Sequence, residues 1–263
     1  MDRLKIIEGV TEYTLPIEFT IKDDNLAVRS RVSDRVFAHG AVDISDGKIN
    51  EKIIRLEGII YGDNRAAYLT NLRALREKIY QEDYKLYQGD PASYNYFINI
   101  AKALKIQDDY MEGQDYCAGK TIIDLLALDP FWYYKSEDSD EETITEDGHS
   151  WTVTNNGNVN VYPVITITAD TTIANLIIQN ETDIPDGEDE GLKFQYQDPA
   201  FKLTSPTLAV DCQGGTVYRS ETNTIRYFSG AFLKLLPGDN TIKWTGSTLG
   251  ASKLKFEFRR RFL

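Results

Sequence analysis

The second half of the chain is a succession of short segments in which apolar and polar residues alternate. Clear examples are residues 163–168, 208–218 and 232–244, which are bounded by Gly or Pro turns. Alternation with period two puts the apolar side chains of a strand on one face, and such turns between strands are typical of antiparallel hairpins. Ten strands are expected, at 151–154, 162–168, 173–179, 192–197, 207–212, 216–218, 225–228, 232–235, 240–244 and 253–262. This pattern predicts a two-sheet sandwich of the jelly-roll kind.

The first half combines strands with one helix. Leu69, Leu72, Leu75 and Ile79 follow one another at spacings of three and four, which predicts an amphipathic helix over residues 65–81 that packs on a sheet. Strands are expected at 4–10, 17–21, 49–61 with a bulge or a switch of faces between Ile53 and Ile54, 84–87, 94–106 and 120–128. The fold class predicted for the first half is therefore a β-sandwich with one packed α-helix.

A polar segment at residues 23–46 interrupts the strands of the first half. It contains Arg29, Arg31, Arg35 and His39 and has no apolar periodicity. Such a segment is typical of a long loop or an arm that leaves the body of a domain.

Two acidic runs account for the charge of the chain. The formal net charge is −12, but residues 136–147 hold seven carboxylates and residues 181–190 hold six, with no Lys or Arg in either run. The rest of the chain is close to neutral. Blocks of like charge are usually solvated loops, so we expect both runs to be loops. Binding to nucleic acid is not expected, because it requires clustered Lys and Arg.

The length of 263 residues favours two domains. The aromatic residues at 131–134 predict a last strand that closes the first core, and the acidic run follows them directly. We therefore expect a first domain at 1–134, an acidic linker at 135–149 and a second domain at 150–263.

The sequence offers little catalytic chemistry. His39 and His149 are the two histidines, and Cys117 and Cys212 the two cysteines, so neither a catalytic triad nor a zinc site or disulfide framework can be assembled. The acidic groups around Asp108 lack the ligand order of a calcium loop. Paired carboxylates could serve a glycosidase, but Asp211 and Glu257 are the acids that fall in predicted strands of the second half. We expect no enzyme activity, no cofactor and no metal, and the sequence shows no apolar run for a signal peptide or a membrane span.

Aromatic side chains leave one binding function open. Trp151, Trp244, Tyr218 and Tyr227 could stack on sugar rings, although strands also bury such side chains in their cores. A carbohydrate-binding sandwich module is therefore the alternative function.

Several segments carry a resemblance to a known family. The strand phrases of the second half, the segment from Leu128 to Tyr133 and the ending from Phe256 to Leu263 are similar to the distal tail proteins (Dit) of long-tailed bacteriophages. The resemblance implies a helix-flanked β-sandwich of which six copies close into a ring, followed by a galectin-like sandwich that projects outward. It also implies a location in the virion, at the phage tail tip, after synthesis in the bacterial cytoplasm.

The resemblance further implies an adaptor with protein partners. The expected partners are five more copies of the chain, the tail tube protein, a tail-tip protein of the tail-associated lysin type and a receptor-binding protein. Neither sequence-specific nucleic-acid binding nor membrane insertion is expected. We expect sheet edges and the polar arm, with Arg29, Arg31 and Arg35, to form the ring contact. The arginines at 259–261 are expected to pair with acidic loops or with a partner subunit.

Overall fold

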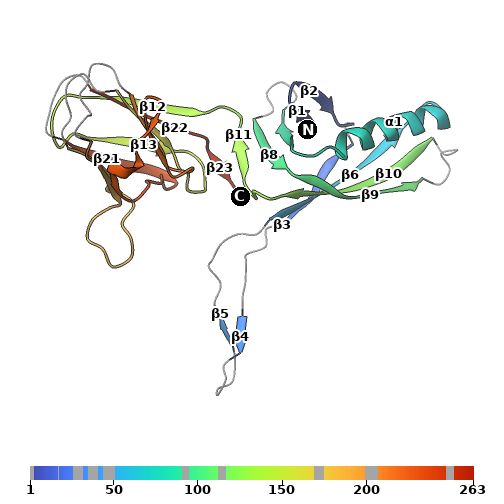
Figure 1. Cartoon of the computed structure of the whole chain (residues 1–263). Helices are drawn as coiled ribbons and strands as arrows, with labels where there is room; N and C mark the ends of the chain where they lie inside the picture. The colour runs from blue at the N-terminus through green and yellow to red at the C-terminus, as the bar shows by residue number, and fades with distance from the viewer. Residues whose placement is uncertain are drawn as a thin grey trace. The chain divides into compact units, whose positions relative to one another are not determined.

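The computed structural model describes residues 3–16, 18–25, 32–34, 41–43, 51–90, 95–111, 117–168, 175–198, 207–246 and 252–263, with the backbone alone at 25, 32–34 and 41–43. The chain consists of two units, Met1–Lys135 and Ser136–Leu263, which are described separately below. Both consist mainly of antiparallel strands, and the first also contains one α-helix (Figure 1). The predicted fold class, mainly β with one packed helix, is confirmed.

Two sheets and the helix form the first unit. In one sheet the strands lie in the order β2 (Thr11–Thr14), β1 (Arg3–Glu8), β7 (Tyr84–Gly89), β8 (Tyr96–Ile100) and β11 (Trp132–Tyr134). In the other the order is β3 (Thr20–Asn25), β6 (Lys52–Tyr61), β10 (Ala118–Ala127) and β9 (Lys102–Tyr110). A further hairpin, β4 (Val32–Asp34) with β5 (Ala41–Asp43), makes a two-stranded sheet of its own.

Helix α1 (Arg65–Ile79) runs along the sheet that contains β6 and β9 (Figure 1). Asn64 starts it, because the side-chain oxygen of Asn64 accepts a hydrogen bond from the Ala67 N–H at 2.9 Å. The buried stripe is Tyr68, Leu72, Leu75 and Ile79, so the predicted stripe is right except that Tyr68 takes the place of Leu69. The Tyr68 hydroxyl occupies the space where Gly119 has no side chain. A close approach to a glycine is a tertiary feature that helical spacing does not reveal.

Two strand predictions in the first unit are wrong in detail. Strand β6 alternates without interruption, with Ile53 47% exposed and Ile54 fully buried, and the irregularity lies instead in β3, between Ile21 and Asp23. The segment predicted as one strand at 94–106 is divided at Ala101 into β8 and β9, which belong to different sheets. The Ala101 N–H donates to the Leu126 carbonyl at 2.8 Å, and this bond holds the crossing point.

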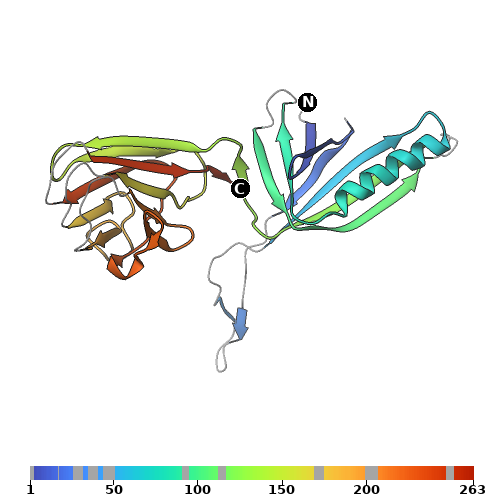
Figure 2. The same cartoon turned by 45° about the horizontal axis from the view of Figure 1, so that its top comes forward.

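The second unit is a sandwich of two sheets (Figure 2). One sheet has the order β12 (Asp138–Ile144), β22 (Ser252–Phe258), β14 (Val164–Thr168), β17 (Thr207–Asp211), β18 (Thr216–Arg219) and β19 (Thr222–Asn223). The other has the order β13 (Ser150–Asn155), β21 (Gly238–Gly246), β15 (Leu176–Asn180), β16 (Lys193–Tyr196) and β20 (Phe228–Gly230). A short strand β23 (Arg261–Phe262) follows β22. Trp244 and Phe194 from one sheet and Phe256 from the other are fully buried in the shared core.

Two of the ten strands predicted for this unit have a different backbone. Residues Ile225–Tyr227 form a short 3₁₀ helix, η1, and β20 begins only at Phe228. Residues 232–235 have alternating burial, with Leu233 and Leu235 at 0% exposure, but pair through a single bridge between Leu235 and Val161. Alternation reports which side chains are buried, and backbone pairing is a separate property that depends on a neighbouring strand.

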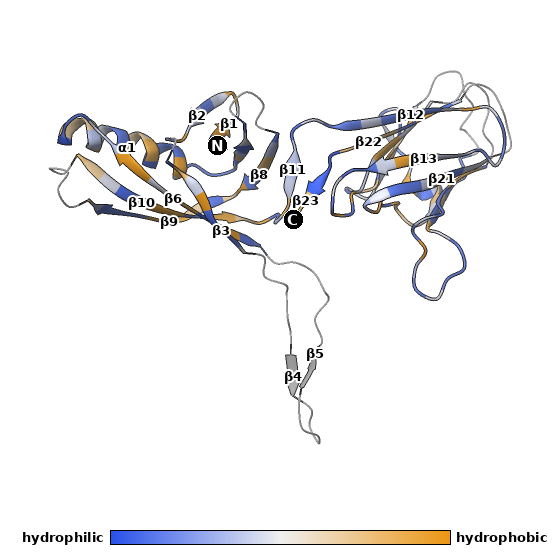
Figure 3. Ribbon diagram, turned by 180° about the vertical axis from the view of Figure 1, so that it is seen from behind, coloured by the Kyte–Doolittle hydropathy of each residue, from blue (hydrophilic) through white to orange (hydrophobic). Residues whose placement is uncertain are grey.

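The first acidic run is not a linker over residues 138–144. These residues form β12, an edge strand paired with β22 over seven residue pairs and hydrophilic along most of its length (Figure 3). The prediction failed because β22 and the residues directly after it supply cations from a distant part of the sequence. Glu141 lies 2.8 Å from the Lys253 ammonium, and Glu137 lies 2.6 Å from the Arg259 guanidinium. The expected pairing of the C-terminal arginines with acidic residues is confirmed at Arg259 and at Arg260, which lies 2.7 Å from Asp138.

The second acidic run agrees with its prediction. Residues 181–190 connect β15 to β16 as a loop, and its positions from Asp186 to Glu190 are exposed. Asp183 is buried and lies 3.3 Å from the Lys234 ammonium.

The core of the second unit predicts a strong dependence on one side chain. Replacing the fully buried Trp244 by Ala should lower the free energy of unfolding of this unit by about 3–5 kcal/mol, because the substitution leaves a large cavity. Tyr218→Ala, at a position 40% exposed on the outer face of β18, should cost less than about 1 kcal/mol. Urea denaturation followed by circular dichroism measures both, and similar losses would contradict the assignment of Trp244 to the core.

Candidate assembly surfaces

The arm predicted at 23–46 begins inside a sheet. Its first residues, Asp23 to Asn25, belong to β3, and β4 and β5 form a hairpin within it, with Val32 opposite Asp43 and Asp34 opposite Ala41. Arg29, Arg31 and Arg35 lie outside the described residues. An isolated two-stranded hairpin is marginally stable in water, so β4 and β5 need further contacts to persist.

The two ends of the arm are joined by an ion pair. Asp24, in β3, and Lys52, the first residue of β6, lie with Oδ1 and Nζ 2.7 Å apart. The Lys52 side chain is 1% exposed, whereas that of Asp24 is 35% exposed. The Trp132 indole N–H donates to the other oxygen of Asp24 at 3.1 Å, which adds β11 to the contact. These three residues were not found from the sequence, and the one available signal was a lysine at an inward position of an alternating strand.

Strands β2, β3 and β9 of the first unit each lie at the edge of a sheet. Thr11, Glu12 and Thr14 of β2 are exposed, and Glu12 lies 2.8 Å from the Lys5 ammonium on β1. An edge strand presents unpaired backbone groups to which another chain can add a strand.

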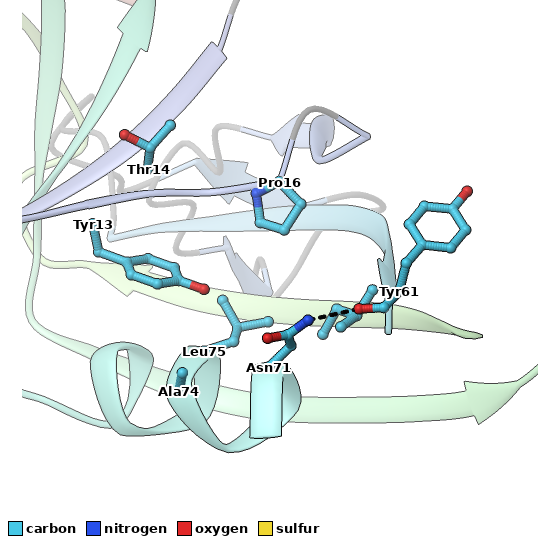
Figure 4. Close-up of a pocket in the computed structure, with 8 residues that line it drawn as sticks. Tyr13, Thr14, Pro16, Tyr61, Asn71, Ala74 and Leu75 are labelled. Carbon is cyan, nitrogen blue, oxygen red and sulfur yellow. Dashed lines mark hydrogen bonds between the residues drawn. The ribbon is translucent and has the colours of Figure 1, made fainter. Parts of the chain in front are cut away.

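A groove lies between β2 and helix α1, with a cavity of about 390 Å³ (Figure 4). Tyr13, Thr14 and Pro16 form one wall, and Asn71, Ala74 and Leu75 from the helix form the other, while Ile60 and Tyr61 lie at the end of β6. The Asn71 side-chain N–H donates to the Tyr61 carbonyl at 2.7 Å and ties the helix to β6. Burial raises the pKa of Tyr13, so this side chain stays a neutral hydroxyl. The groove therefore combines an edge strand with mostly apolar walls.

The outer face of the other sheet carries paired charges. Arg55 of β6 makes two hydrogen bonds to the Asp124 carboxylate of β10, at 2.7 and 3.0 Å. The hydrogen bond to Asp124 and its charge raise the pKa of Arg55. On the same face the Lys120 ammonium lies 3.0 Å from Glu57. Since each of these two cations lies beside a carboxylate, neither offers an unpaired positive charge to a phosphate backbone.

The aromatic residues proposed for sugar stacking do not form one site. Trp244 is in the core and Tyr218 points outward from the opposite sheet. Trp151 is partly buried and packs against Phe256 at 6.0 Å between ring centroids. The guanidinium of Arg226 lies 4.6 Å from the centre of the Tyr227 ring and covers one of its faces. No specific observation favours sugar binding.

The side chains that could act in catalysis are held in structural contacts or are buried. His149 lies 3.1 Å from Glu142, and His39 is outside the described residues. Asp211 accepts the backbone N–H groups of Gln213 and Gly214 and thereby closes a turn. Burial raises the pKa of Cys212 to about 12, which keeps it an unreactive thiol.

Among the residues that the structure describes, no three His, Cys, Asp or Glu side chains converge as a metal site. The helices of the described segments are too short or too polar to cross a bilayer.

Taken together, the two units define a two-part β protein in which a helix-flanked first half precedes a sandwich. No known family model matches the sequence, and comparison with curated proteins finds no similar sequence. Among solved structures, the chain is similar to the crystal structure of the Dit (gp 19.1) protein of SPP1, a paradigm of the hub adsorption apparatus in phages that infect Gram-positive bacteria. The TM-score is 0.70, the identity is 13%, and the match covers 99% of each chain. The chain therefore has a Dit-like fold, and the resemblance to Dit proteins is confirmed at the level of the fold.

The ion pair at the ends of the arm predicts an asymmetric response to mutation. Asp24→Asn leaves the buried Lys52 charge without a counterion and should destabilise the first unit by about 3 kcal/mol. Lys52→Met removes the buried charge, leaves the partly exposed Asp24 to water and should cost less. Chemical denaturation compares the two, with Arg55→Met on the outer face of β6 as a control of small effect. A larger loss for Lys52→Met would show that the pair does not control the stability of this region.

Proposed function

We propose that this protein is a distal tail protein, a non-enzymatic structural component of the tail tip or baseplate of a siphophage or related prophage. The observation that carries the proposal is the match to the SPP1 Dit protein over 99% of both chains, which includes both units in one order. A β-sandwich by itself occurs in proteins with many unrelated functions. A match that extends over the whole chain and includes two different units is a more specific indication of function.

In this proposal six copies form a closed ring. One face of the ring joins the tail tube, the other receives a tail-tip protein of the tail-associated lysin type, and the second unit is a galectin-like domain that holds receptor-binding proteins. Identical chains that meet through two different patches end their assembly when a ring closes. The edge strand β2 with its groove, and the arm that starts at the Asp24–Lys52 pair, are two different surfaces of this kind. The mature protein would reside in the virion after synthesis in the cytoplasm of the bacterial host.

The charge distribution supports protein partners. The paired charges on the outer face of β6 and β10 leave little net field there, and the exposed loop at 181–190 is acidic. Neither surface attracts nucleic acid in a sequence-specific manner. Arg29, Arg31 and Arg35 are the cations of the arm that can pair with an acidic neighbour.

Ring formation gives the first test of the function. Six chains of 29.9 kDa should form a particle of about 180 kDa, seen by light scattering over a range of concentrations and by negative-stain electron microscopy. Replacing Arg29, Arg31 and Arg35 together by Glu should weaken the ring and leave the monomer folded, because interface charges control register and association rate. The matched control combines Asp186→Lys, Glu188→Lys and Asp189→Lys in the acidic loop and should leave the ring intact. Monomers under all conditions, with and without the tip protein, would contradict the hub function and favour the sugar-binding alternative.

The groove beside β2 gives a second test. Ala74→Arg places a long charged side chain in the wall of the groove and keeps a good helix former in α1. It should raise the concentration needed for assembly at least about tenfold, if strand addition at β2 is one of the two contacts. Ala66→Arg, at another exposed alanine of the same helix, is the control and should have little effect. Equal assembly of the two variants would place the contact elsewhere.

A further inference from the structure

Strand β12 turns three carboxylates toward the interior of the second unit. Residues directly opposite one another in an antiparallel pair lie on the same face of the sheet. The register pairs Asp138 with Phe258, Asp140 with Phe256 and Glu142 with Leu254, and these three β22 residues belong to the core. The inward positions of this edge strand are therefore charged, whereas a typical sandwich strand has apolar side chains at such positions.

Each inward carboxylate has a polar neighbour from a different segment. Asp138 lies 2.7 Å from the Arg260 guanidinium, and Glu142 lies 3.1 Å from the His149 ring. Burial and the charge of Glu142 raise the pKa of Asp140, and the nearby Trp151 indole partly offsets this rise. Polar contacts thus take the place of core packing along most of β12.

The apolar attachment of β12 is limited to its last residue. Ile144 is buried in the core and the six residues before it are polar. The side chains of the ion pairs are between 21% and 63% exposed, so dissolved salt can screen them. By comparison, the central strand β14 has neighbours on both sides and buries Ile165 and Ile167.

We propose that β12 is a detachable strand, which separates from β22 while the rest of the sandwich stays folded and thereby turns residues 136–149 into a tether between the two units. Edge strands with few apolar contacts open at lower free energy than the core of a domain. Detached, these residues can span roughly 45–50 Å. The strand and the tether are two states of the segment that the sequence predicts as a linker.

The titration of β12 is consistent with weak attachment. Burial, and then the charge of Glu142, raise the pKa of Asp140, so the charged form of Asp140 opposes the attached state. The hydrogen bond from Lys253 lowers the pKa of Glu141, so the ionised Glu141 favours attachment. Acid would change these two contributions in opposite directions. Salt weakens all the ion pairs and is the better experimental variable.

Hydrogen–deuterium exchange of the full chain, read by mass spectrometry, tests the proposal. Backbone amides of 138–144 should exchange at least about tenfold faster than those of β14, and raising NaCl from about 0.05 to 1 M should accelerate them several-fold without changing β14. Slow exchange of β12 that does not respond to salt would overturn the proposal. Equal acceleration of β12 and β14 would also overturn it, because it would mean that the sandwich opens as a whole.

Variants with opposite expected effects separate detachment from general instability. Asp140→Asn removes the charge that opposes attachment and should slow exchange of 138–144, whereas Arg260→Gln should speed it. Glu188→Gln, in the exposed 181–190 loop, should leave the exchange of 138–144 unchanged. Thr143→Cys with Lys253→Cys puts two cysteines directly opposite each other, and their disulfide should abolish the salt effect. If Asp140→Asn speeds exchange, or if the disulfide leaves the salt effect unchanged, β12 is not detachable in the proposed way.

Discussion

The first unit depends on the ladder between β6 and β10. The two strands pair over ten residues without a shift in register, from Lys52 with Ala127 to Tyr61 with Ala118. This pairing puts Ile54, Leu56 and Ile60 in the core below α1 and leaves the charged pairs on the outer face. The arm enters at one end of β6 and the helix begins just after its other end. One continuous register therefore positions both the root of the arm and the helix wall of the groove.

The second unit combines an apolar core with one edge held by charge. Inward carboxylates on an edge strand discourage the addition of further strands, because an added strand would bury these carboxylates. The same carboxylates leave β12 with one side chain in the core, that of Ile144. Protection against aggregation and ease of detachment thus both result from the inward carboxylates of β12. The first unit differs, because its edge strand β2 lies beside a mostly apolar groove.

In the proposed function the protein works through surfaces and needs no catalytic groups with perturbed pKa values. The strongly shifted pKa values belong to side chains held in packed interiors, such as Cys212, and they result from burial. Burial alone makes a side chain inert, whereas a catalytic group needs burial together with access to a substrate. The strand edges, the groove and the charge pairs are accordingly the features that support the proposed function in assembly.

Local patterns in the sequence determined the class of fold. Alternation and turns specify strands, three-to-four spacing specifies α1, and the phrases of the second half indicate a Dit-like chain, because each of these signals depends on residues close together in sequence. Only the tertiary structure decided the role of the acidic run at 136–147. A run of carboxylates reads as a solvated linker until Lys253, Arg259 and Arg260, more than a hundred residues away, are placed beside it. The contact between Asp24, Lys52 and Trp132 could not be predicted for the same reason. The energy of an ion pair depends on the distance between the charges and on their burial, and the tertiary structure determines both quantities.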